Sequence, residues 1–240
     1  MTRRRWIADE WNASSAVLLH GQAAHLATVL RAQLGQEFDI VAGDTVRRGV
    51  VERVRADAVQ FSLHEEIETA GPLPLIVGLS IVRFERMEWA IEKLTELGVT
   101  RIVPLQAQRS EKHLVQAAAK RAERWRKIAR ESAQQSRRRD VPEISDPSTL
   151  PEWLKEDLVG LRLVLSEQER VQSLRASLDA ALEPRENIYA AIGPEGGWTE
   201  TELSTFAERG WQSVSLGPRI LRAETAAIAV GTLVGAMLGP

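Results

Sequence analysis

The sequence of 240 residues contains no cysteine. This absence excludes disulfide bonds, thiolate nucleophiles and cysteine-ligated zinc or iron–sulfur sites. It is compatible with a reducing compartment, and we expect a cytoplasmic protein. Long apolar runs are absent too: the most apolar segment, residues 226–238, is 13 residues long, whereas a membrane helix needs about 20. The arginines at 3–5 are followed by a polar stretch, so we expect neither a signal peptide nor a membrane partner.

Metal-binding and serine-hydrolase patterns are missing as well. The four histidines, His20, His25, His64 and His113, do not recur at metal-ligand spacing, and no His-Glu-x-x-His sequence occurs. The G-x-S-x-G turn that exposes a serine nucleophile is also absent. We therefore expect no metal site and no serine-based hydrolysis.

Charge is unevenly distributed along the chain. The formal net charge is −2, from 31 Lys and Arg against 33 Asp and Glu. Residues 109–139 hold eleven basic and three acidic residues, a net of +8, which leaves −10 for the rest of the chain. The small net charge argues against a non-specific nucleic-acid binder, whereas the concentrated basic segment indicates a local contact with an anion.

Residues 1–71 predict a small β-barrel, because short β-rich segments recur between glycines and turns. These segments are residues 17–19, 38–41, 45–54 and 58–64. One expected helix, residues 25–34, interrupts them. The sequence Ala-Gly-Pro-Leu-Pro at 70–74 disfavours both helix and strand, so we expect a boundary there between domains of residues 1–71 and 74–240.

After this linker, the pattern changes to strands that alternate with helices. Residues 75–82 form an apolar run, residues 85–97 have helical spacing, and Gly98 stands where a helix C-cap is expected. Residues 101–105 give the next strand, so this β-α-β unit predicts a parallel sheet and an α/β fold. Further expected strands are 162–165, 188–192 and 214–216, and further expected helices are 115–136, 199–209 and 224–238.

The expected helix at 115–136 is amphipathic. One side carries small residues and Trp125, and the other carries a basic stripe that includes Arg124. Arg109 precedes this helix and Arg138 follows it. Two interpretations are open: a solvated helix face, or a phosphate-binding surface whose affinity salt would screen.

Two glycine-bearing strand ends are the clearest candidates for a ligand site. Residues 192–202 place a strand end before three glycines, and Thr199 with Glu202 forms a capping box that starts a helix. Residues 216–226 repeat the arrangement, with Arg222 and Glu224 at a helix start. Ligands of open parallel sheets bind outside the carboxyl ends of strands, so the two ends could share one pocket. A plain tight turn, a surface ion pair and a helix-capping carboxylate are the structural alternatives.

Taken together and in order, these motifs resemble one family. They are residues 94–99, Arg109-Ser110, and the segments 131–142, 193–197 and 216–225, and His25-Leu26 with residues 29–31 matches an N-terminal signature. The chain resembles RsmE, the bacterial 16S ribosomal RNA uridine-N3 methyltransferase family of the SPOUT class. Trp198, Ala223 and Arg83 depart from the residues usual in that family.

The resemblance implies an N-terminal PUA-like β-barrel that binds RNA and a C-terminal SPOUT α/β domain with a trefoil knot. It also implies S-adenosylmethionine as the cofactor, 16S rRNA in the small ribosomal subunit as the substrate, and a homodimer. The terminal helix, which is apolar on nearly every side, fits such a dimer.

The resemblance also implies site residues by position. The cofactor-binding residues it indicates are Leu165, Gly193, Pro194, Glu195, Gly196, Gly197, Leu216, Gly217, Ile220, Leu221 and Thr225. Arg222 is the expected donor to the developing charge on uracil, and Glu224 is the candidate base. Arg109, Arg124 and Arg138 are the expected RNA contacts.

Two other functions fit part of the pattern. A non-catalytic RNA-binding or ribosome-assembly protein explains the basic helix but leaves both glycine-bearing strand ends without a ligand. A small-molecule transferase or hydrolase explains the strand ends but leaves the basic stripe and the barrel without a role.

Overall fold

The computed structural model describes residues 5–181 and 187–238. The chain divides into two compact units: residues 1–71 with 133–140, and residues 72–132 with 141–240. The proline-containing linker at 70–74 contains the first division. Nothing in the sequence pattern indicates that residues 133–140 belong to the first unit.

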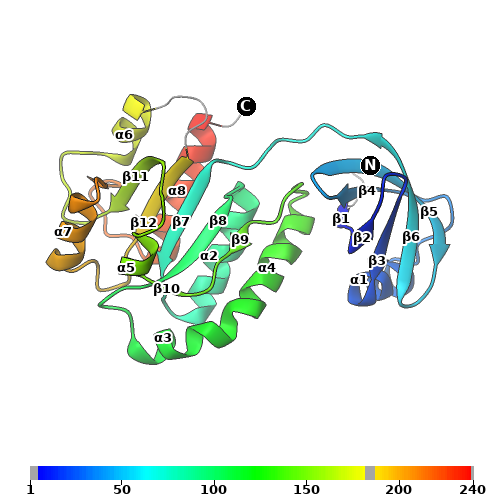
Figure 1. Cartoon of the computed structure of the whole chain (residues 1–240), viewed down its shortest axis with the longest axis horizontal. Coiled ribbons are helices and arrows are strands. Elements are labelled where there is room, and N and C mark those ends of the chain that lie inside the picture. Colours follow the sequence, from blue (N-terminus) through cyan, green and yellow to red (C-terminus); the bar gives the residue numbers. More distant parts are fainter. Residues whose placement is uncertain (1–4, 182–186, 239–240) are drawn as a thin grey trace. The chain divides into compact units, whose positions relative to one another are not determined.

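The first unit is built on a six-stranded sheet that curls (Figure 1). Its strand order is β1-β4-β5-β6-β3-β2, and all neighbours are antiparallel except β1 and β4. The strands are β1 Arg5–Ile7, β2 Glu10–Trp11, β3 Ser15–Leu19, β4 Glu37–Ala42, β5 Thr45–Val54 and β6 Ala58–Glu66. Two register shifts between β5 and β6 increase the local bend. The predicted barrel therefore has the form of a curled sheet around Leu18, Ile40 and Phe61, which are fully buried.

The helical segment of this unit begins and ends earlier in the chain than predicted. The structure shows α1 (His20–Ala24) followed by a π-helical turn at His25–Val29, where the Leu30 amide donates to the His25 carbonyl. The expected helix at 25–34 is thus wrong in extent. Arg31, at a φ of 51°, turns the backbone out of the helical conformation directly afterwards.

The second unit is a parallel sheet covered by helices. Its order is β10-β8-β7-β12-β11-β13, with β9 also beside β8, and every pairing is parallel. The strands are β7 Leu75–Ser80, β8 Arg101–Gln106, β9 Glu143–Ile144, β10 Ser148–Thr149, β11 Gly160–Leu165, β12 Asn187–Ile192 and β13 Gln212–Val214. The predicted α/β class is confirmed, whereas the trefoil knot stays a prediction.

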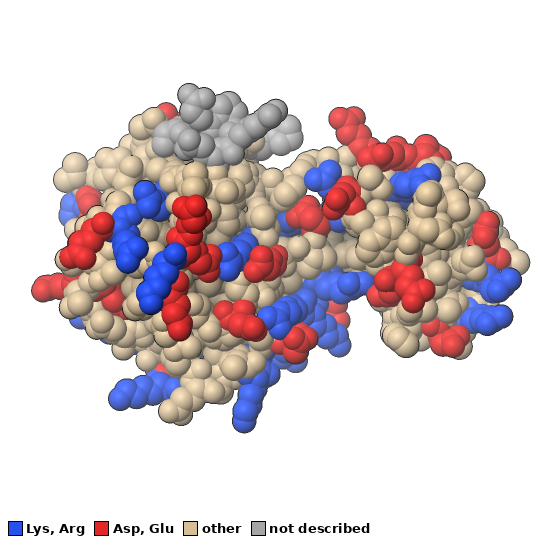
Figure 2. Space-filling view, in the orientation of Figure 1, with Lys and Arg blue, Asp and Glu red and all other residues tan. Residues whose placement is uncertain are grey.

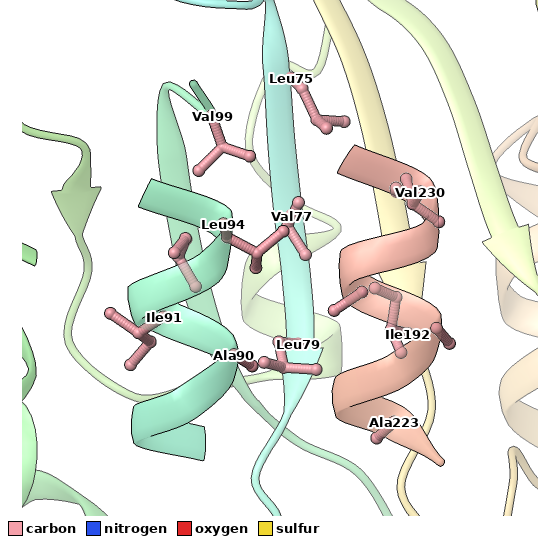
Figure 3. Close-up of a cluster of buried hydrophobic side chains, with 14 of the residues drawn as sticks. Leu75, Val77, Leu79, Ala90, Ile91, Leu94, Val99, Ile192, Ala223 and Val230 are labelled. Atoms are coloured by element: carbon pink, nitrogen blue, oxygen red, sulfur yellow. The ribbon is translucent and has the colours of Figure 1, made fainter. Parts of the chain in front are cut away.

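Helices α2 and α8 lie side by side on one face of this sheet (Figure 3). Leu75, Val77 and Leu79 of β7 pack there, because alternate residues of a strand point to the same face. On the opposite face, Trp153 and Leu105 approach the backbone of Gly78 so closely that a Cβ would lie 2.5 Å from the indole. The helices are α2 Phe84–Leu97, α3 Lys112–Ala118, α4 Ala122–Gln135, α5 Leu150–Trp153, α6 Leu174–Ala181, α7 Glu200–Glu208 and α8 Ala223–Leu238.

The helix ends show which local predictions hold. Gly98 adopts a φ of 100° and caps α2 as predicted, donating its amide to the carbonyls of Leu94 and Thr95. The predicted single helix at 115–136 is wrong in extent, because a 3-10 turn at Ala119–Arg121 separates α3 from α4. The guanidinium of Arg121 lies 4.8 Å from the centre of the Phe84 ring at this turn. In the part of the chain that the structure describes, no helix is long and apolar enough to cross a membrane.

Candidate functional site

A pocket opens at the carboxyl ends of β12, β11 and β13, which are neighbours in the sheet, and extends to the start of α8. It encloses about 710 Å³ when its open mouth is included. Its position follows the rule that parallel sheets bind ligands beyond their strand ends.

The loop after β12 forms one wall of the pocket. Gly193, Pro194 and Gly197 line it. Gly197 has a φ of 67°, a conformation that favours glycine, and a Cβ there would lie 3.1 Å from Oε1 of Glu167. The glycine therefore allows the loop to approach the segment after β11.

Trp198 fixes the base of this loop. Its indole Nε1 donates to the carbonyl of Leu165 at 3.1 Å, and its ring stands edge-on to Phe206 with 5.0 Å between centroids. The side chain is buried and lines the pocket. Trp198 therefore belongs both to the core and to the pocket wall.

A side chain from the segment after β8 contacts the backbone of the same loop. Arg109 Nη1 donates to the carbonyl of Gly196 at 2.7 Å and to that of Trp198 at 3.3 Å. The predicted capping box of α7 is confirmed, and its Glu202 also accepts the backbone amide of Gln108 at 2.8 Å. Arg109, expected to contact RNA, is thus engaged by the pocket loop.

The loop after β13 forms the second wall. Gly217 has a φ of 113°, and among the described residues, its two chain neighbours aside, no atom lies within 4 Å of the position of a Cβ there. The side chain of Ile220 is 82% exposed and that of Leu221 is 36% exposed, although both line the pocket. Apolar side chains exposed at the mouth of a cavity are suited to an apolar or aromatic ligand surface.

The residues expected to carry the chemistry lie beside the pocket. Arg222 is exposed and is flanked by two lining residues, Leu221 and Ala223. Glu224 is 5% exposed, its Oε1 lies 3.7 Å from Nε of Arg86, and its Oε2 is buried without a hydrogen-bond partner among the described residues. Sequence reasoning missed Arg86, because nothing local links helix α2 to the start of α8.

The structure brings most of the predicted cofactor residues together. The predicted residues that line the pocket are Leu165, Gly193, Pro194, Gly197, Leu216, Gly217, Ile220 and Leu221. Glu195, Gly196 and Thr225 are adjacent in sequence to lining residues but do not line it. The lining residues that the predicted site did not name are Ser166, Glu167, Gln168, Ile192, Trp198, Leu203, Val214, Ser215, Arg219, Ala223 and Ala226. Ile192, Trp198, Arg219, Ala223 and Ala226 lie within the two glycine-bearing segments that the sequence indicates. The others have no signal beyond their position in or after an expected strand or inside an expected helix.

The basic residues of the second unit gather over α3 and α4. Figure 2 shows Lys and Arg side chains along this surface, and the exposed ones include Lys112, Lys120, Arg121 and Lys127. Arg124 is also exposed, but Nε and Nη2 donate to Glu88 at 2.6 and 2.8 Å, and this hydrogen bonding raises the arginine pKa.

Arg138 is placed differently, in the first unit. Only 8% of its side chain is exposed, and it forms an ion pair with Asp140. Burial lowers the pKa of Arg138, against the opposing effect of Asp140. Within residues 5–181 and 187–238, no group of three or more His, Asp or Glu could hold a metal ion.

The chain matches known proteins over most of its length. Residues 69–235 match the family model described as an RNA methyltransferase domain. Ribosomal RNA small subunit methyltransferase E of Synechocystis sp. is 32% identical, over 99% of this chain and 78% of that protein. The protein of the same name from Bacillus subtilis is 31% identical, over 84% of this chain and 82% of that protein.

Solved structures agree with these relatives. Ribosomal RNA small subunit methyltransferase E from Neisseria gonorrhoeae, bound to S-adenosyl methionine, is 27% identical over 98% of both chains with a TM-score of 0.85. A putative methyltransferase from Legionella pneumophila, in complex with the bound cofactor SAM, is 27% identical over 99% of this chain and 98% of that one, with a TM-score of 0.83. The predicted resemblance is confirmed: this chain belongs to the ribosomal RNA small subunit methyltransferase E family.

Proposed function

We propose that this protein transfers the methyl group of S-adenosylmethionine to N3 of one uridine in 16S rRNA of the small ribosomal subunit. The observation that carries the proposal is the pocket at the ends of β11, β12 and β13, combined with membership of a family whose solved relatives bind this cofactor. A cytoplasmic location fits a substrate in the ribosome.

The residues of the pocket fit the cofactor. S-adenosylmethionine has a flat adenine, a ribose diol and a charged sulfonium. Leu165, Leu216 and Ile220 offer apolar surface for the adenine, and the glycine-containing loops bring backbone groups close to it. Glu167 adds a carboxylate, the type of group that binds ribose hydroxyls in nucleotide sites.

The bound cofactor would supply an electrophilic methyl group, and the remaining chemistry concerns the uracil ring. N3 of uridine carries a proton at neutral pH, so methylation requires its removal, and negative charge develops on O2 and O4. We assign Arg222 as the donor that stabilises this charge, because it is exposed beside the pocket. We assign Glu224 as the acceptor of the N3 proton, because its buried Oε2 has acceptor capacity that no described residue uses.

We further propose that the basic surface over α3 and α4 binds the phosphates of the rRNA, with Arg124 among its contacts. Sequence-independent phosphate contacts would position the RNA, while the groups beside the cofactor pocket, Arg222 and Glu224, would act on the base. The first unit would hold structured RNA, as the resemblance implies for a PUA-like domain. We include two further arginines among the proposed RNA contacts: Arg109, which donates to the pocket loop, and Arg138, which forms an ion pair with Asp140.

The homodimer and the trefoil knot are also part of the proposal. Ile228, Leu233 and Met237 of α8 are only partly buried in the single chain, and a second copy would cover them. Sedimentation equilibrium tests the homodimer, because a monomer at micromolar concentration would contradict it. A crystal structure traced through residues 187–238 tests the trefoil knot.

The decisive experiment is methyl transfer to small subunits isolated from a strain that lacks the mark. Mass analysis of the digested rRNA, as nucleosides and as nuclease-derived oligonucleotides, should identify N3-methyluridine and place it at one position. Calorimetry with S-adenosylmethionine alone distinguishes the proposal from its main alternative, since a non-catalytic RNA-binding protein would not bind the cofactor and the titration would show no heat of binding. A different methylated base, or none, would contradict the proposal.

A further inference from the structure

Arg86 connects two segments that are distant in sequence and that both border the pocket. It lies in the first turn of α2, after the carboxyl end of β7. Its Nη1 forms a hydrogen-bonded ion pair with Oε1 of Glu195, in the loop after β12. Its Nε lies 3.7 Å from Oε1 of Glu224, at the start of α8. One guanidinium therefore faces one carboxylate from each segment.

Both carboxylates are adjacent to the pocket lining. Pro194 precedes Glu195 and lines the pocket, and Ala223 precedes Glu224 and lines it as well. The Arg86 side chain is itself outside the lining. Its contacts therefore act on the backbone positions of the walls and not on a ligand directly.

The exposure of the three side chains indicates where the constraint acts. The side chains of Arg86 and Glu195 are 26% and 36% exposed, whereas that of Glu224 is 6% exposed. Exposed ion pairs contribute little to global stability. The planar guanidinium nevertheless holds two carboxylates in fixed directions, one at each of two nitrogens, which a lysine ammonium does not. The main effect of such a contact is on the relative position of the two walls.

We propose that Arg86 is a positioning residue that holds the loop after β12 and the start of α8 in the arrangement that binds S-adenosylmethionine. The proposal rests on the proposed function, since it presumes that the pocket takes this cofactor. Arg86 does not touch the reacting atoms. It acts through Glu195 and Glu224 and sets the affinity for the cofactor before any RNA binds.

A matched control exists in the same unit. Arg101, the first residue of β8, also faces two glutamates: Glu156, at 2.7 Å, and Glu143, at 3.1 Å. Its side chain is 25% exposed, close to the value for Arg86. It lies at the amino end of a parallel strand, whereas the pocket lies at the carboxyl ends. Arg101→Gln therefore removes a similarly exposed arginine and its two ion pairs away from the pocket, although both of its partners are exposed.

The experiment measures the dissociation constant of S-adenosylmethionine by calorimetry on the full chain without RNA. We expect Arg86→Gln to bind about tenfold more weakly, a typical effect for residues that couple to a site through intermediate contacts. Arg86→Lys should regain only part of this loss, because it restores charge but not the planar fork. Arg101→Gln should bind like the wild type. The thermal midpoint without cofactor should fall further in Arg86→Gln than in Arg101→Gln, because only Arg86→Gln leaves a buried carboxylate without its counter-ion.

A double variant separates positioning from simple charge compensation. Arg86→Gln leaves the Glu224 carboxylate buried without its counter-ion, which could itself distort the site. Arg86→Gln/Glu224→Gln removes that charge. Cofactor binding that stays about tenfold weak in the double variant supports positioning, and binding restored to the wild-type value overturns it.

The remaining outcomes are also distinct. Wild-type affinity in Arg86→Gln overturns the inference and leaves the proposed function intact, and so does an equal loss of affinity in Arg101→Gln. If the wild-type protein binds no S-adenosylmethionine, the proposed function fails, and the role of Arg86 fails with it.

Discussion

Replacing Gly197 by alanine tests the pocket loop directly. Gly197 has a φ of 67°, and a Cβ there would lie 3.1 Å from Oε1 of Glu167. The carboxylate is at the end of an exposed side chain and can move aside, so the backbone conformation dominates the cost. An L-residue in the left-handed region is strained by about 1–2 kcal/mol.

This strain must appear in one of two measurements. If the loop keeps its conformation, the folded protein loses the whole amount, and the thermal midpoint falls by about 2–8 °C at roughly 2–4 °C per kcal/mol. If the loop relaxes, binding must restore the original conformation, and the same 1–2 kcal/mol weakens cofactor affinity by about 5-fold to 30-fold. Any mixture of the two should sum to the same free energy.

The assay combines thermal unfolding with calorimetric titration of S-adenosylmethionine. Gly35→Ala is the control, because Gly35 lies in the first unit at a φ of 80°, and no described residue other than its chain neighbours comes within 4 Å of its Cβ position. It should lose similar stability and bind the cofactor normally. Wild-type stability together with wild-type affinity in Gly197→Ala would refute the reasoning about this loop.

Three further predictions concern catalysis, packing and pH. Glu224→Gln should lower kcat by about 10²–10⁴ at saturating cofactor and RNA if the carboxylate accepts the N3 proton; near-native turnover would exclude that role. Gly78→Ala should cost about 1–3 kcal/mol or more in chemical denaturation, because its Cβ would lie 2.5 Å from the buried Trp153 ring and 2.8 Å from Leu105. The amides of Gln172 and Val171 hold the pKa of Glu169 below its ordinary value of 4.5. Its stabilising contribution is therefore present above that pH and is lost as pH falls through the lowered pKa, so the difference in thermal midpoint between wild type and Glu169→Gln should shrink below pH 4.5.

The sequence predicts the local features of this fold well, because they depend on neighbouring residues. The C-cap at Gly98 and the capping box of Thr199 and Glu202 each require a few residues in a fixed order, and both are present. The alternation of strands and helices after residue 74 also follows from hydrophobic spacing alone. The 3-10 turn at Ala119–Arg121 has no such signal, since neither glycine nor proline marks it.

The candidate site is only partly predictable for a related reason. Glycine-rich strand ends indicate two walls, but the third, Ser166 to Gln168, follows β11 without glycine or a capping motif. Its place in the pocket depends on the order β12-β11-β13, which is a property of the whole sheet. Arg86 is hidden for the same reason, because its partners come together only when α2 and α8 pack side by side.

Counting charges along the chain also overestimates the surface available to RNA. Several arginines and lysines in the basic segment have carboxylate partners: Arg124 with Glu88, Arg126 with Glu123 and Asp146, Lys127 with Glu131, and Arg138 with Asp140. A phosphate that binds such a side chain must replace its carboxylate. Glu88, Asp140 and Asp146 lie outside residues 109–139, so the net of +8 counted along that segment exceeds the charge available to RNA.

Removing one such partner should strengthen RNA binding. Glu88→Gln deletes the carboxylate that Arg124 contacts at 2.6 Å and leaves the guanidinium available for a phosphate. We expect tighter binding and a slope of log affinity against log salt that steepens by about 0.7–0.9, the value for one additional phosphate contact. Arg124→Glu should change both quantities in the opposite direction, and cofactor affinity should not change in either variant. If Glu88→Gln alters neither the affinity nor the slope, Arg124 does not contact phosphate, and the RNA surface must be sought elsewhere than over α3 and α4.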